Sequence, residues 1–356
     1  MTTGPHISDD RPFRFTLALA RDLSVVITLS VLALYAGSGF LIPLALAFLS
    51  FVLITAVSDR VSAAVGAPVW LANLVGVVLV LAGFFTIMFV IGGQATQFAR
   101  AMGNYETALD GAVTRMVALF GPEVTGIVRD TLAGVDLSRL ARGAVGGATY
   151  ALNTFLLVSL YVAFLMVERR TLQHKLLLAA GDRRLGQDMA SVMTAISTSL
   201  QSYLGVKTFI SLLTAGISYV VFRLLGLEFA ETWAVLTFAL NFIPSIGSIV
   251  AVIFPALVSL VQFDSVTPFL IIVLFCGTVQ FMIGNFLDPA LLGRSLNMSS
   301  FVVILALTFW TVVWGLIGAF LSVPLTVCIL IVFSHIPALR PVAILMSKDG
   351  RLSPET

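Results

Sequence analysis

The chain has 356 residues, of which 59% are hydrophobic and only 11% are charged. A soluble globular domain carries charge on about a quarter of its residues, so this composition excludes that class of protein. The net charge of +2 gives no indication of nucleic-acid binding, and none is expected. We predict an all-α polytopic membrane protein with about six full spans, two re-entrant helical hairpins and amphipathic helical arms outside the bilayer.

The residue patterns of catalytic and metal sites are missing from the sequence. Both cysteines, Cys276 and Cys328, lie inside apolar runs without a second thiol or a histidine at ligand spacing, so we expect buried core side chains. No Ser-His-Asp order, no paired His with Glu and no phosphate-binding glycine loop occurs. We therefore predict that the chain is not an enzyme and uses no cofactor and no metal.

The first 93 residues read as a polar arm followed by three spans. Residues 1–22 are charged and lack a cleavage site after a short apolar core, so we expect no cleavable signal peptide. Residues 23–93 then form spans 1 to 3. Within them Gly37-Ser38-Gly39 divides the first uncharged run into two limbs of about 27 Å each, just enough to cross the bilayer twice.

Two charged, amphipathic segments interrupt the apolar chain. Residues 94–143 carry five basic and five acidic residues, and we expect an extracytoplasmic arm that packs on protein. The alternative is a helix on the bilayer surface, where Lys and Arg usually dominate the polar face. Span 4 follows at 144–167, and residues 168–205 form a second, cytoplasmic arm. Lys207 then stands where it is expected to snorkel at the edge of the fifth span.

The distribution of basic residues predicts the orientation. With the amino terminus inside, fourteen of the twenty Lys and Arg residues are cytoplasmic, whereas the inverted arrangement leaves six there. We expect both termini, including the tail 336–356, to be cytoplasmic.

Residues 206–335 are predicted to form a transport core that contains two interrupted apolar runs. The first run, 232–262, would be about 46 Å long as one straight helix, well over the hydrocarbon thickness of ~30 Å. Its middle reads Asn241-Phe242-Ile243-Pro244-Ser245-Ile246-Gly247. We favour a hairpin that enters the membrane and turns back. A single tilted helix with a proline kink is the alternative.

The second run, 300–335, is interrupted by Trp314-Gly315-Leu316-Ile317-Gly318 and by Pro324. Between the two runs lies the span Pro268–Leu287, which ends in Asp288-Pro289. Two interrupted segments beside such a helix indicate a transport site near the bilayer midplane. We expect the two bends to face each other around a polar pocket.

The candidate site residues come from the bends and from the helix between them. Free backbone groups at the first tip, where a helix begins near Ser245, suit an anionic or hydroxyl-rich ligand, although Pro244 and Gly247 can also serve only to shape a turn. Asp288 is the candidate for ion coupling, because ionisable groups near the bilayer are costly. Its alternative role is a turn residue at the water interface. The predicted substrate-binding residues are Asn241, Pro244, Ser245, Gly247, Ser248, Gln280, Asn285, Gly315, Gly318 and Pro324.

The carboxyl-terminal third carries a series of motifs with a specific order and spacing. They are Trp233, Asn241 to Gly247, Pro255, Gln280, Asn285, Asp288-Pro289, Gly293, Trp314-Gly315, Gly318 and Leu321 to Leu325. In these motifs, and in its order of spans and arms, the chain resembles the AI-2E family of bacterial transporters, the autoinducer-2 exporter group. One departure is Asn297-Met298-Ser299-Ser300-Phe301, which stands where the resemblance leads us to expect a His-Pro pair.

The resemblance implies a homopentamer in the bacterial cytoplasmic (inner) membrane, with the two hairpins forming a substrate site that moves like an elevator. Members of the family are associated with export of a furanone signal and some with sodium–proton exchange. We therefore expect a secondary transporter that exports a small polar signal or metabolite, with membrane lipid and this substrate as its partners. The alternatives are a sodium–proton antiporter and, from another class, a passive channel or a structural oligomeric membrane protein.

Overall fold

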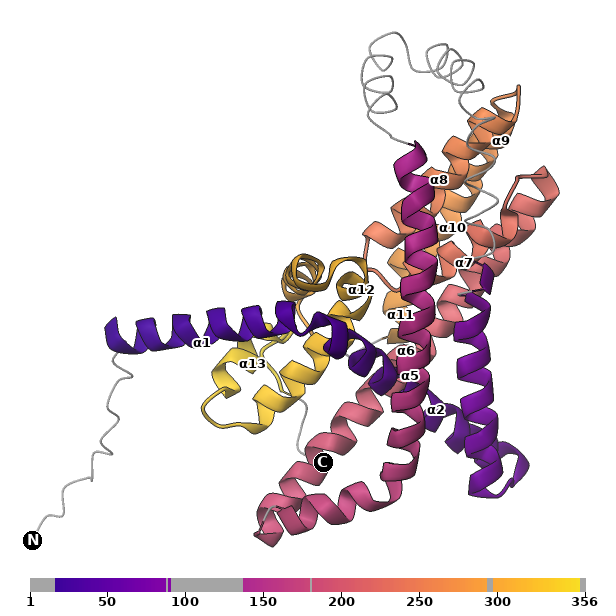
Figure 1. Ribbon diagram of the computed structural model, residues 1–356. Helices are drawn as coiled ribbons and strands as arrows, with labels where there is room; N and C mark the ends of the chain where they lie inside the picture. Colours follow the sequence, from indigo (N-terminus) through magenta and orange to yellow (C-terminus); the bar gives the residue numbers. More distant parts are fainter. Residues whose placement is uncertain (1–16, 88, 91–136, 180, 293–296, 353–356) are drawn as a thin grey trace, which may run out of the picture.

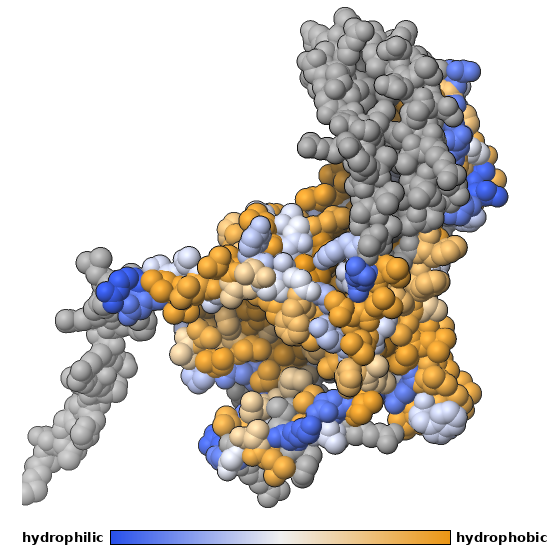
Figure 2. All heavy atoms as spheres, viewed as in Figure 1, coloured by the Kyte–Doolittle hydropathy of each residue, from blue (hydrophilic) through white to orange (hydrophobic). Residues whose placement is uncertain are grey.

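The computed structural model describes residues 17–87, 89–90, 137–179, 181–292 and 297–352, and these residues are predominantly helical (Figure 1). In this described part, six helices are long and apolar enough to cross a membrane. They are Ser38–Val65, Val69–Ile87, Tyr150–Arg169, Arg184–Leu225, Thr267–Leu291 and Ser300–His335. The surface in Figure 2 is correspondingly dominated by hydrophobic residues. The prediction of an all-α polytopic membrane protein is confirmed.

The first uncharged run breaks where the glycines predict. Helix α1, Leu17–Ala36, and helix α2, Ser38–Val65, meet at Gly37. In Figure 1, α1 extends away from the bundle and does not fold back along α2. Its end is held by the indole of Trp314, whose Nε1 donates a hydrogen bond to the Leu34 carbonyl at 2.9 Å. The double crossing of the bilayer stays a prediction.

Two helices of 43 residues each, α5 (Leu137–Ala179) and α6 (Arg183–Leu225), run past the predicted boundaries of span 4 and its neighbouring arm. At ~1.5 Å per residue each is about 65 Å long, twice the hydrocarbon thickness. The predicted arm 168–205 is therefore the end of α5, a turn and the beginning of α6. The predicted arm 94–143 lies outside the described residues, except for residues 137–143 at the start of α5.

The first interrupted run forms a helical hairpin. Helix α7, Ala230–Leu240, is followed by the turn 241–245 and by helix α8, Ile246–Gln262. A Cβ atom on Gly247 would overlap the carbonyl of Leu240, seven residues earlier. Seven residues of straight helix rise about 10 Å, so this close approach requires the chain to reverse. The hairpin prediction is confirmed over the single kinked helix.

A nearly straight helical segment follows and is interrupted by two π-turns. Its parts are α9 (Thr267–Ile271), η1 (Ile272–Cys276), α10 (Gly277–Met282), η2 (Ile283–Leu287) and α11 (Asp288–Leu292). Asp288 lies inside this helical segment, so its predicted alternative as a turn residue is wrong. A π-turn often marks a functional position in a helix.

The second interrupted run, helix α12 (Ser300–His335), also folds back on itself. Gly315 has φ 63° and ψ −143°, which breaks the helix there. The indole of Trp310 donates a hydrogen bond to the Thr326 hydroxyl at 3.2 Å, although sixteen residues of straight helix would separate these side chains by about 24 Å. A Cβ on Gly318 would overlap the Trp310 carbonyl. The second predicted hairpin is confirmed.

The chain after α12 returns to the beginning of that helix. Helix α13, Arg340–Met346, is followed by an antiparallel bridge between Ser347 and Met298. The segment that departs from the expected His-Pro pair is thereby tied to the tail, since Ser299 N donates to the Met346 carbonyl at 3.0 Å. The largest buried cluster lies between α2, α6 and α12 and includes Val52, Leu200 and Trp310.

Candidate functional site

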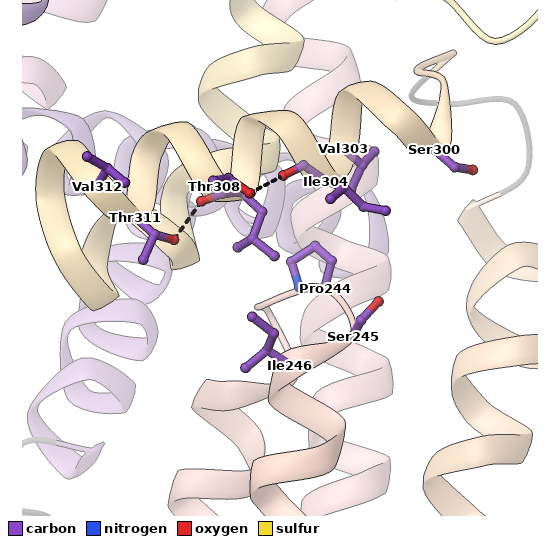
Figure 3. A pocket seen from close by; sticks show the side chains of 10 residues that line it. Pro244, Ser245, Ile246, Ser300, Val303, Ile304, Thr308, Thr311 and Val312 are labelled. Atoms are coloured by element: carbon purple, nitrogen blue, oxygen red, sulfur yellow. Dashed lines mark hydrogen bonds between the residues drawn. The ribbon is translucent and has the colours of Figure 1, made fainter.

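A cavity of about 670 Å³ lies between the tip of the α7–α8 hairpin and the first limb of α12 (Figure 3). The first limb runs across the tip, so that Pro244, Ser245 and Ile246 lie opposite the threonines of α12. The lining residues are Pro244, Ser245, Ile246, Ser300, Val303, Ile304, Leu307, Thr308, Thr311 and Val312. This volume is in the range of small-molecule sites, as is a largely apolar wall with a few polar groups.

The polar groups of this cavity are mainly hydrogen-bond acceptors. The hydroxyls of Thr308 and Thr311 donate to their own helix, to the carbonyls of Ile304 at 3.0 Å and Leu307 at 2.5 Å. Their oxygen lone pairs remain open to the cavity. Ser245, at the start of α8, makes no capping hydrogen bond. A ligand that donates several hydrogen bonds suits this wall.

The start of α8 is less open to an anion than the sequence predicts. The Ile246 amide donates to the Pro244 carbonyl at 2.6 Å, and the Gly247 amide donates to the Ile243 carbonyl at 3.2 Å. Two of the first amides of the helix are thus paired within the turn. Because a helix terminus attracts anions through its unpaired amides, the geometry favours a neutral ligand here.

The two bends meet through apolar side chains. The rings of Phe242, in the first turn, and Phe320, just after the second bend, have centroids 4.9 Å apart. Ile243 packs in the same region with Leu307 and Ala319. The cavity lies beside this dry contact, against the first limb of α12.

The remaining predicted residues of the two bends do not line the cavity. Gly247 and Gly318 are buried where each hairpin closes, and Pro324 is buried in the second limb of α12. Ser248 is half-buried on α8, and Gly315 is exposed at the break in α12. The structure thus shows what the glycines do for the backbone, whereas their part in substrate binding stays a prediction.

A second polar region lies along one face of α6. Five residues at steps of three or four share this face, and each residue as a whole is at most 7% exposed. We call them the α6 stripe: Tyr203, Lys207, Ser211, Thr214 and Ser218. Such a row at helical spacing in the more apolar carboxyl-terminal half of α6 is a recognisable signal, but only Lys207 was predicted from the sequence to have a special role.

Lys207 belongs to a buried ion pair. Its Nζ lies 2.5 Å from Oδ2 of Asp288 in α11. The expectation that Lys207 snorkels to the membrane edge is wrong, because the side chain is 8% exposed and points to a carboxylate inside the protein. The carboxylate of Asp288 is therefore already paired with a positively charged side chain.

The predicted polar residues divide between the α6 stripe and the outer surface. Asn241 is buried, and its Nδ2 donates to the Ser211 hydroxyl at 3.2 Å. Gln280 in α10 is also buried. Asn285 is exposed, and its Nδ2 donates to the Phe281 carbonyl of its own helix at 2.9 Å. The structure thus separates Asn285 from Gln280.

The comparison with known proteins decides the family. The model that describes AI-2E family transporters matches residues 23–338. The chain belongs to the AI-2E family. Its resemblance to these transporters is thereby confirmed over most of its length, and a multi-pass membrane transporter, not an enzyme, is the shared description of the family and its members.

Relatives of this AI-2E family transporter occur in several bacteria. A candidate transport protein of Haemophilus influenzae is 29% identical over 84% of this chain and 86% of its own length. A candidate transport protein of Borreliella burgdorferi is 32% identical over 56% of each chain. The AI-2 transport protein TqsA of Escherichia coli K12 is 34% identical over 55% of this chain and 56% of its own length. The matches to the last two thus span just over half of each relative.

The described part of this AI-2E family transporter has no group of three or more His, Cys, Asp or Glu side chains placed to hold a metal ion. Two groups of its polar side chains are candidates for function, those at the cavity and those of the α6 stripe. The first suits hydrogen bonding to a small molecule, and the second includes Lys207, whose charge is paired with Asp288.

Proposed function

We propose that this AI-2E family transporter is a secondary carrier that exports a small polar signal or metabolite of the autoinducer-2 type. The family and the name of the TqsA relative support this proposal. The observation that carries it is the cavity at the first hairpin tip, where Ser245, Thr308 and Thr311 meet an apolar wall. A compact, neutral molecule with several hydroxyl groups fits this combination.

The proposed transport cycle moves the hairpins relative to the rest of the protein in an elevator-like manner. Both hairpins contain a break, at Pro244 and at Gly315, and such interrupted helices are typical of transport sites near the bilayer midplane. We further propose a homopentamer in the bacterial inner membrane, with both termini in the cytoplasm. These properties follow from the family resemblance and from the distribution of basic residues.

The second candidate function is sodium–proton exchange, and the buried pair of Lys207 and Asp288 favours it. Ionisable side chains inside a membrane protein usually belong to an ion or substrate path. In this alternative, Asp288 exchanges its partner during the cycle and the cavity at the hairpin tip has no transported ligand. Replacing Asp288 by Asn would then remove the pH and sodium dependence of transport.

Counterflow in proteoliposomes tests the leading proposal. Vesicles loaded with unlabelled autoinducer-2 are expected to accumulate labelled autoinducer-2 transiently, because a carrier exchanges one molecule for another. A passive channel or a purely structural oligomer shows no such trans-stimulation. Exchange of sodium for protons without any autoinducer-2 flux would support the antiporter instead.

The threonines of α12 provide the matched variants. Thr308→Val and Thr311→Val keep the side-chain shape and remove the oxygen acceptor. Each is expected to weaken apparent substrate affinity about two- to twelvefold, the equivalent of one hydrogen bond of about 0.5–1.5 kcal/mol. Thr278→Val on α10 is the control, because its hydroxyl likewise bonds its own helix, at Leu274, but lies outside the cavity. Equal effects at all three positions would contradict the assignment of the cavity.

A further inference from the structure

Four buried polar atoms along the α6 stripe lack a protein partner. They are the hydroxyl oxygen of Tyr203, Oδ1 of Asp288, and both Nε2 and Oε1 of Gln280, none of which has a hydrogen-bond partner among the described residues. Tyr203 is 1% exposed and Gln280 is 5% exposed. Buried polar groups in folded proteins are almost always hydrogen-bonded. These unpaired atoms, two on Gln280 and one each on Tyr203 and Asp288, indicate that small polar ligands belong beside them.

We propose that the α6 stripe binds internal water at two places, between Tyr203 and Asp288 and beside Gln280. Water suits both places because it donates and accepts hydrogen bonds. The Tyr203 hydroxyl is a donor, the free Asp288 oxygen is an acceptor, and the Gln280 amide supplies one of each. The proposal does not depend on the transported substrate, so its failure would leave the proposed function standing.

Two contacts fix the register between α6 and the α9–α11 segment. Lys207 pairs with Asp288 at one end, and Ser218 lies beside Cys276 at the other. The two segments are therefore antiparallel. Gln280 lies between these contacts along its segment, four residues from Cys276.

This register places Gln280 opposite the middle of the stripe. Ser211 and Thr214 are fully buried there. The Thr214 hydroxyl donates to the Ile210 carbonyl at 2.7 Å, and the Ser211 hydroxyl accepts from Asn241. Both oxygens keep a free lone pair, so a water molecule beside Gln280 has acceptors for its protons.

The π-turn η2 brings Gln280 and Asp288 toward one face of their segment. In a regular α-helix, residues eight positions apart point about 80° apart, since each residue turns the helix by about 100°. A π-turn takes more residues per turn and removes part of this difference. Asp288 pairs with Lys207 of α6, and the buried Gln280 lies about 12 Å away along the segment, which is why two separate water sites are proposed.

A metal cation is a poor alternative ligand at Asp288. The ammonium group of Lys207 already lies 2.5 Å from the carboxylate and would repel a second cation. Calcium and magnesium sites need about six oxygen ligands, whereas the unpaired buried oxygens of the described residues there are one of Asp288 and the hydroxyl of Tyr203. Water needs only two to four polar partners.

Radiolytic hydroxyl-radical labelling tests the proposal on the unmodified protein. Radicals form from water during X-ray exposure and label side chains that touch bound water, and mass spectrometry locates the label. Tyr203 is expected to be labelled several-fold faster than Phe222, because both rings are buried in apolar clusters but only Tyr203 has a hydroxyl group that can hold water. Equal, background labelling of the two rings would overturn the inference at Tyr203.

Two variants extend the test. Tyr203→Phe keeps the ring and removes the hydroxyl, so labelling at this position should fall toward that of Phe222. Gln280→Leu should lower the melting temperature, because it removes the bridging amide. An increase in melting temperature would show that no water binds the Gln280 amide, because removing an unpaired buried amide stabilises the protein. Met282→Leu, which is exposed on the same helix, is the control for the substitution itself.

A comparison of salts separates water from a bound cation. The melting temperature of the unmodified protein should be the same in sodium chloride and in choline chloride at equal ionic strength. A rise specific to sodium that disappears in Asp288→Asn would overturn the proposal in favour of a sodium site.

Discussion

The buried ion pair of Lys207 and Asp288 should make the effects of substituting these two residues on stability strongly non-additive. The side chains are 8% and 21% exposed, and their charged atoms are 2.5 Å apart. Removing one partner of a buried pair costs about 3–5 kcal/mol, because the other charge is left in the interior without a partner. Asp288 is the more exposed of the two. We therefore expect Lys207→Met to lower the free energy of unfolding by about 3 kcal/mol. Asp288→Asn should lower it by about 4 kcal/mol, because it leaves the more buried charge, that of Lys207, without a partner.

The double variant Lys207→Met/Asp288→Asn should recover most of this loss. It leaves no buried charge, and neutral replacements of buried pairs are often nearly neutral in stability. Thermal unfolding in detergent, followed by tryptophan fluorescence, measures the cycle. At about 2 °C per kcal/mol for a chain of this size, the single variants should melt about 6–8 °C below the unmodified protein, and the double variant close to it.

An exposed ion pair in the same protein provides the control. Lys175 and Glu168 form a pair whose side chains are 60% and 44% exposed. Lys175→Met should cost less than about 1 kcal/mol, since water screens such pairs. Two results would refute this reasoning. Lys207→Met could lower the stability as little as Lys175→Met does, or the losses of stability from Lys207→Met and Asp288→Asn could simply add in the double variant. Either result would show that the two buried charges do not stabilise each other.

Three further predictions concern the hairpins and the orientation. Gly247→Ala should abolish the yield of folded protein, because the new Cβ would overlap the Leu240 carbonyl. Gly277→Ala, where a Cβ meets open space, should leave expression and melting temperature unchanged, and equal yields of the two variants would contradict the tight first turn. Gly315→Ala should lower stability by about 1–3 kcal/mol, because φ 63° with ψ −143° is a backbone conformation essentially restricted to glycine. An unchanged melting curve would argue against the break. In a chain without native cysteines, Leu178→Cys should react with an impermeant thiol reagent from the cytoplasmic side and Ser265→Cys from the other; reaction of both from one side would rule out the proposed topology.

The hairpins could be predicted from sequence because their cause is local. Pro244 and Gly315 interrupt apolar runs, and the structure breaks at these positions. The length of the first run also argued against one straight crossing. What the sequence could not supply was the direction in which each hairpin points. The cavity therefore includes Thr308 and Thr311, which sit in an apolar run and carry no local signal.

The α6 stripe was missed for a different reason. The predicted boundary at residue 206 follows the change in hydropathy, whereas α6 begins at Arg183 and continues without a break. The predicted boundary at residue 206 placed Tyr203 and Lys207 in different elements, so Lys207 was predicted to lie at the end of a membrane span. The partner of Lys207 lies 81 residues away, and no periodicity within one helix can reveal such a pairing.

The hydrogen bond from Trp314 to Leu34 has a mechanical consequence. The last carbonyls of a helix have no partner within it, and at the end of α1 one of them is satisfied by an indole beside the second bend. Any displacement of that bend must either pull the junction of α1 and α2 along with it or leave a carbonyl unbonded. The amino-terminal helix is in this way attached to the second bend of the transporter by this hydrogen bond.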